Sequence, residues 1–330
     1  MKGLFSVLWL VVFVYLSGCS SSDSGGGTTA AVNYDGMKTA VEITDANAKT
    51  TVTDTLKNST TSGDASGKGF TKASSAISFS KPIARLKADI QSKITSRESI
   101  GGTTNGTCGG SLVSSGDLNP AGDSFSFSVN ATFTDFCDTD NTTLNGSVSM
   151  SGSINSTTFV MTYNAAFTNF TAVVDAGTES YTIDGSTSGV FGLNFLESST
   201  ISTLSNISVK DNISGVTYFM ENHKLEITTD ASGGLFSATT DTTYSGRFYQ
   251  SDKGYIDITT VTPFHRTSNA TYPESGSAKF TGSNGAVVTL TATDSSQYSL
   301  ETDTNGDGTA ESTETGAWSD LGVGLFTSSL

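Results

Sequence analysis

The sequence predicts an all-β fold, mainly an antiparallel meander, with one or two short N-terminal helices. Apolar and polar residues alternate strictly over 125–133, and the pattern returns over 159–167. Gly, Asn and Asp separate such runs. One face of each strand is apolar and the other is rich in Ser and Thr, so we expect an antiparallel sheet with one face in water. The periodicity leaves open a single meander, a sandwich or a partly open barrel.

Composition excludes several classes of protein. The 330 residues include 17 Lys and Arg against 32 Asp and Glu, a formal net charge of −15. Such an acidic surface repels phosphate backbones, so we expect no nucleic-acid partner. No second long apolar run follows the N-terminus, which excludes a polytopic membrane protein. Three cysteines are too few for a disulfide-dense scaffold.

The N-terminus has the three parts of an export signal. Lys2 supplies a positive charge, and Leu4–Leu16 is a 13-residue apolar run interrupted only by Ser6. A transmembrane helix needs about 20 residues, so this run fits a signal peptide better. The segment Leu16-Ser17-Gly18-Cys19 then resembles the lipobox of bacterial lipoproteins. The resemblance covers residues 1–19, and an ordinary secretory signal with an incidental cysteine is the alternative.

The lipobox resemblance implies cleavage before Cys19 and acylation of its thiol by diacylglycerol, with palmitate among the expected acyl groups. In proteobacterial lipoproteins, Asp after the lipidated cysteine favours retention in the inner membrane. Ser20 stands there, which implies delivery to the outer membrane, on its periplasmic or surface face. Residues 20–33 are rich in Gly, Ser and Thr and predict a flexible tether.

Two helices are predicted in the segment that follows the tether. The first starts near Thr44-Asp45 and continues with Val52 and Leu56 at i, i+4 spacing. The second starts at Pro82 and ends at Gly101-Gly102. Its apolar stripe consists of four residues: Ile83, Leu86, Ile90 and Ile94.

We therefore divide the chain into four parts. These are a signal peptide (1–18), the lipidated cysteine with its tether (19–33), an N-terminal segment with helices (34–104) and a β-rich domain (105–330). The segment from Tyr34 to Ala48 and the overall pattern resemble uncharacterised β-rich bacterial lipoproteins. That loose resemblance implies no activity.

A weak internal repeat runs through the β-rich part. Phe133–Phe136 precedes Leu144–Ser147, and Phe167–Phe170 precedes Ile183–Ser186, with a fainter third copy at Leu204–Ile207. The first elements are 34 and 37 residues apart, enough for two or three strands with their turns. We interpret the repeat as a β-meander unit. The alternative is that a composition biased toward Thr, Gly and Phe produces the similarity between the segments.

Cys108 and Cys137 are the cysteines left after lipidation of Cys19. An exported protein can form disulfides, and these two have no other cysteine to pair with. A redox pair favours close CxxC-like spacing, which is missing here. We predict a structural disulfide.

Residues 303–314 match the calcium-loop pattern D-x-[DN]-x-[DN]-G-x5-E without a mismatch. This loop resembles those of EF-hand and dockerin-type modules over 12 residues only. The preceding segment, 297–302, reads as a strand, so the usual entering helix is missing; the alternative is a polar hairpin turn. The resemblance implies structural calcium with six ligand residues: Asp303, Asn305, Asp307, Thr309 through its carbonyl, Glu311 and the closing Glu314.

Catalytic motifs are lacking. His223 and His265 are the only histidines, 42 residues apart, and neither has a metal-ligand spacing. No nucleophile elbow or phosphate-binding loop occurs. We predict no enzyme but a lipid-anchored envelope protein with a structural or binding role.

Two alternative functions follow from the same features. The first is a carrier or chaperone of a hydrophobic envelope component, which needs an apolar groove that the helix at 82–99 leaves open. The second is a calcium-dependent adhesin or glycan-binding module, which needs exposed aromatic residues near the calcium loop, such as Trp318, Tyr249 or Tyr272. The protein, lipid or glycan partner is not specified by the sequence.

Overall fold

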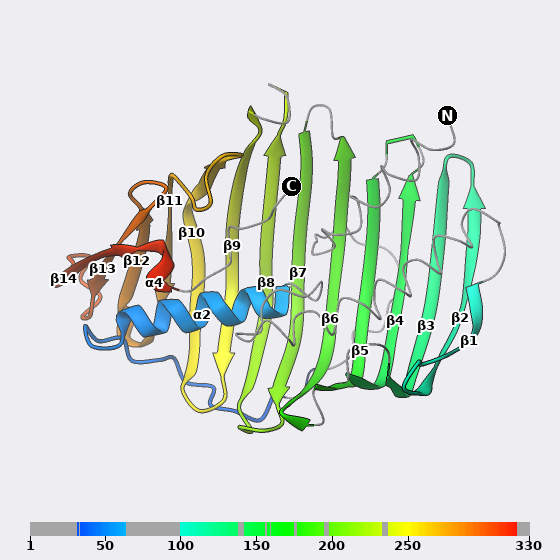
Figure 1. Ribbon diagram of the computed structural model, residues 1–330. Helices are drawn as coiled ribbons and strands as arrows, with labels where there is room; N and C mark the ends of the chain where they lie inside the picture. Colours follow the sequence, from blue (N-terminus) through cyan, green and yellow to red (C-terminus); the bar gives the residue numbers. More distant parts are fainter. Residues whose placement is uncertain are drawn as a thin grey trace.

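In the part of the chain that the structure describes, fourteen strands form one antiparallel sheet, in which spatial order follows chain order from β1 to β14 (Figure 1). The computed structural model describes residues 32, 34–63, 100–137, 142–155, 157–158, 160–174, 177–194, 198–232 and 237–321. The prediction of an all-β antiparallel meander is confirmed, and its architecture is a single sheet. The first strand starts at Ile100, inside the segment that we assigned to the N-terminal part.

The strands are β1 Ile100–Asn105, β2 Gly109–Ala121, β3 Ser124–Cys137, β4 Thr143–Asn155, β5 Val160–Val174, β6 Glu179–Asn194, β7 Ser198–Asp211, β8 Thr217–Asp230, β9 Thr239–Gln250, β10 Gly254–Thr267, β11 Ser275–Thr281, β12 Val287–Ala292, β13 Gln297–Asp303 and β14 Ser312–Ala317. The helices are α2 Ala48–Gly63, the short 3-10 turn η4 Ser283–Gly285 and α4 Trp318–Leu321. Sequence reasoning missed α4, which has only four residues.

The core lies on one face of the sheet. In β3, Phe127, Val129, Ala131 and Phe133 are buried, while the residues between them are exposed. This is the alternation that the sequence predicts over 125–133, because successive side chains in a strand point to opposite faces.

Helix α2 lies across this apolar face and packs against β7, β8, β12 and β13 (Figure 1). Val52 and Leu56 are fully buried in the core cluster, as their i, i+4 spacing predicts. Lys49 pairs with Glu314 at 2.7 Å, and Lys253 pairs with Asp54 at 2.9 Å. The helix predicted from Pro82 lies outside the described residues. No helix in the described ranges is both long and apolar enough to cross a bilayer.

The chain enters the sheet through a strap, residues 34–41. The ring of Tyr34 stacks on Phe219 at 5.6 Å and lies 5.1 Å from Tyr249. The Met37 amide donates to the Ser251 carbonyl at 3.0 Å, and the Val41 amide donates to the Tyr255 carbonyl at 2.9 Å. The strap is therefore held by aromatic packing and by backbone hydrogen bonds to the strand ends.

A disulfide joins Cys108 to Cys137, with a Cα–Cα distance of 5.2 Å, as predicted. It ties the turn before β2 to the end of β3. In the chain-entropy model, closing a loop of about 30 residues contributes roughly 3–4 kcal/mol.

A row of β-bulges crosses the sheet and explains the sequence repeat. Asp135 and Asn169, the third residues of the first two copies, have φ of 46°, and the strand register shifts at both. The Asp135 amide donates to Asn145 Oδ1 at 2.8 Å, and the Asn169 amide donates to Asp184 Oδ1 at 2.6 Å. Each copy is thus a bulge capped by an Asx side chain on the next strand.

The third copy was assigned to the wrong part of this motif. Asn206 is the capping residue, because its Oδ1 accepts from the Asn222 amide at 2.9 Å. The bulge residue is Asn222, with φ of 48°. Sequence spacing could not reveal this, because here the cap precedes the bulge in the chain.

The bulge row predicts a strong effect at Gly146, which has φ of +102°. An added Cβ there would lie 2.2 Å from the Asn169 carbonyl oxygen. Gly177 is the matched control, with φ of +99° and open space around it. We expect Gly177→Ala to cost about 1 kcal/mol of unfolding free energy, from the backbone alone. We expect Gly146→Ala to cost about 3 kcal/mol, because a clash is added. Urea unfolding measures both, and equal costs would contradict the close approach.

Candidate metal site in the loop between β13 and β14

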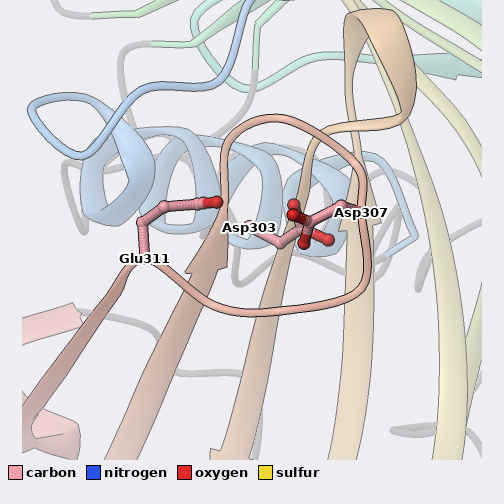
Figure 2. Close-up of side chains that lie close together, drawn as sticks. All are labelled: Asp303, Asp307 and Glu311. Atoms are coloured by element: carbon pink, nitrogen blue, oxygen red, sulfur yellow. The ribbon is translucent and has the colours of Figure 1, made fainter.

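The candidate site is the loop of residues 304–311, which joins the last two strands. Asp303 ends β13, and β14 begins at Ser312. The strand expected before the loop is therefore present, where an EF-hand would have a helix. Figure 2 shows the loop beside α2.

Three carboxylates converge in this loop. Asp303, Asp307 and Glu311 each offer an oxygen, and these oxygens all lie within 4.8 Å of one another. Figure 2 shows the Asp303 and Asp307 carboxylates together inside the loop, with Glu311 reaching toward them from the other side. Carboxylate oxygens are among the ligands that calcium prefers.

The loop is shaped by hydrogen bonds to the same side chains. Gly306 and Gly308 donate their amides to the two oxygens of Asp303, at 2.6 and 2.8 Å. Glu311 accepts from the Thr304 amide at 2.6 Å and from the Asn305 side-chain amide. Each carboxylate oxygen has more than one lone pair, so these bonds leave acceptor capacity for a cation.

The electrostatics of Asp303 suit a cation ligand. Desolvation acts to raise its pKa, but backbone hydrogen bonds from the loop outweigh it, so that the pKa lies below its ordinary value. The donors are the amides of Gly308, Gly306, Asp307 and Asn305. Asp303 is therefore anionic at neutral pH.

The remaining sequence-predicted ligands are placed differently. Asn305 Oδ1 accepts from the Asp307 amide at 2.8 Å, and the Thr309 amide donates to Asp307 Oδ1 at 2.8 Å. Glu314 lies on β14 and pairs with Lys49 of α2, and this hydrogen bond is the main cause that raises the pKa of Lys49. The structure thus brings Asp303, Asp307 and Glu311 together and engages Glu314 elsewhere.

Other candidate residues lie apart from this loop. Cys19 is outside the described residues. His223 is buried in the core, whereas His265 is partly exposed and its Nδ1 lies 2.8 Å from Asp241 Oδ1. Sequence reasoning missed the link between Lys49 and Glu314, because these residues are 265 positions apart.

The aromatic residues expected near the calcium loop are engaged in packing. Trp318 is fully buried and stacks on Tyr272, with ring centroids 6.1 Å apart. Tyr249 is 8% exposed and lies under the strap.

Comparison with known proteins adds no relative: the chain matches no protein family, no curated protein and no solved structure.

The motif and the geometry make opposite predictions for Glu314. If the three converging carboxylates hold calcium, Asp303→Asn and Asp307→Asn lower calcium affinity at least about tenfold, because each removes a charged ligand. Glu314→Gln leaves the affinity nearly unchanged, since Glu314 pairs with Lys49. Calcium titration by calorimetry measures all three variants. A loss of binding in Glu314→Gln equal to that in Asp303→Asn would contradict the three-carboxylate site.

Proposed function

We propose that this protein is a non-enzymatic, lipid-anchored envelope protein with a structural or binding role. The observation that carries the proposal is the order of a positive charge, an apolar run and Leu16-Ser17-Gly18-Cys19 at the N-terminus. Ser20 supports delivery to the outer membrane. The surplus of acidic residues argues against a nucleic-acid partner.

The strap supports a tethered arrangement. Fourteen residues, 20–33, separate Cys19 from Tyr34, where the strap begins. If the tether that the composition predicts is unstructured, a chain of this length spans roughly 20 Å on average. Because Tyr34 is packed against Phe219 and Tyr249, a pull on the tether acts on β8 and β9. The contacts of Tyr34 with β8 and β9 would thus connect the sheet to the membrane anchor.

Calcium in the β13–β14 loop belongs to this proposal as a structural ion. The β13–β14 hairpin contacts the start of α2 through the pair of Lys49 with Glu314 and through Ser312, which donates to Asp45. An ion held by Asp303, Asp307 and Glu311 would offset the mutual repulsion of three carboxylates. It would therefore stiffen the hairpin that holds α2.

The packing of aromatic residues favours a structural role over the two alternatives. A glycan-binding module needs exposed rings, but Trp318 and Tyr249 are buried, and Tyr272 is half-buried and stacks on Trp318. A carrier needs an uncovered apolar groove, but Phe136, Phe170 and Phe280 are fully buried. Part of the apolar face is covered by α2.

Anchoring is tested by Cys19→Ser in a bacterial host that processes lipoproteins. We expect the wild-type chain to incorporate labelled palmitate and to sediment with membranes, because the acyl chains bind the bilayer. The Cys19→Ser variant should lose both properties. The double variant Cys108→Ala/Cys137→Ala is the control and should keep the label, since these thiols form the disulfide. Labelling that persists in Cys19→Ser would refute the anchor.

A further inference from the structure

His223 is a buried imidazole without a partner in the centre of the sheet. Its side chain is 1% exposed, and neither ring nitrogen has a hydrogen-bond partner within the described structure. It lies on the core face of β8, and its neighbours Met220 and Leu225 belong to the same apolar cluster as Leu56 of α2. Leaving a buried polar group unpaired costs about 1–3 kcal/mol, which an apolar residue here would avoid.

The bulge at Asn222 is what turns His223 into the core. Alternation continued from Met220 would bury residue 222 and expose residue 223, and one inserted residue reverses this. In the structure Asn222 is exposed and His223 pairs across the strands with Ser205. Loss of the bulge would exchange the two side chains between faces. Without the bulge, this part of β8 would place the imidazole in water instead of in the core.

The sheet offers His223 hydroxyl groups but no charge. On β7, the buried Ser205 hydroxyl lies 3.2 Å from that of Thr187 on β6. On β9, the ring of Tyr244 is 6.5 Å from the imidazole and is the titratable group on that side. On β8 itself, Glu221, Lys224 and Glu226 alternate onto the opposite face, and Tyr218 lies nearer the start of the strand.

Helix α2 offers no compensating charge from its described side chains. Lys49 pairs with Glu314, and Asp54 pairs with Lys253 at the turn between β9 and β10. A proton on His223 would thus create a buried charge without a described partner, on a strand against which α2 packs.

We propose that His223 is an acid-sensitive latch, whose protonation drives the imidazole out of the core and releases α2 from β7 and β8. The charged imidazole gains hydration only when it leaves the core, and loss of the bulge at Asn222 would place it on the solvent face. At neutral pH the uncharged ring stays in the core while α2 packs on β7 and β8, and the domain is closed.

The direction of the pH dependence follows from burial, which lowers the pKa of His223 from 6.5 to about 4. Between these two values the unfolded or opened chain binds the proton and the closed one does not. Stability of the closed state is therefore complete above the higher value and is lost as the pH falls toward the lower one.

Hydrogen exchange of the full chain tests the latch. Amide exchange in α2 is compared at about pH 7 and about pH 5, after correction for the intrinsic pH dependence of exchange. The lowered pKa predicts that opening of α2 increases about twentyfold at the lower pH. Exchange in β3 and β4 should change little, because neither strand packs against α2 or His223. An equal increase throughout the sheet would overturn a local release.

Two variants show whether the pH dependence of α2 opening comes from His223 or from other groups that bind protons. His223→Phe should abolish the difference between the two pH values. His265→Gln should preserve it, since His265 is partly exposed and paired with Asp241. A pH response that survives in His223→Phe overturns the proposal.

If His223→Phe does not fold, the wild-type chain can be used to test the proposal instead. With two histidines in the sequence, NMR resolves each imidazole. One should titrate only together with the opening of α2, and titration of both without any change in α2 would equally overturn the latch.

Discussion

The rest of the structure depends on one constraint: a single sheet of fourteen strands has one continuous apolar face, which must be kept from water. Alternation concentrates most large side chains on that face, and the other is rich in Ser and Thr apart from Phe219 and Tyr249, which pack against Tyr34 of the strap. The two described α-helices cover parts of this face. Helix α2 covers the face from β7 to β13, and α4 buries Trp318 and Leu321 at the far end.

The bulge row is the second consequence of building one wide sheet. Bulges increase local twist and reorient side chains, and here they recur in β3, β5 and β8 with an Asx cap each time. The same device that shapes the sheet also decides which residues enter the core. At β8 it brings in His223, so that a mainly apolar face acquires a buried imidazole at its centre.

Local patterns in the sequence predicted the local structure well. Alternation over 125–133 gave β3, the spacing of Val52 and Leu56 gave the buried side of α2, and Cys108 pairs with Cys137. Features that depend on distant partners were not predictable. Glu314 forms an ion pair instead of closing the loop, because the fold places Lys49, 265 positions away in the sequence, beside it. The burial of His223 depends on the one-residue bulge at Asn222, which interrupts the alternation of apolar and polar residues and so could not be predicted from it.

The central claim, a lipid-anchored protein whose last hairpin holds a calcium ion, is tested most directly by native mass spectrometry of protein purified gently from its own membrane. The account predicts a chain that starts at Cys19, with acyl groups, one disulfide and the added mass of one calcium ion. A mass equal to the unacylated chain would contradict the anchor. A mass equal to the acylated chain alone would contradict the ion and leave the hairpin held by its hydrogen bonds.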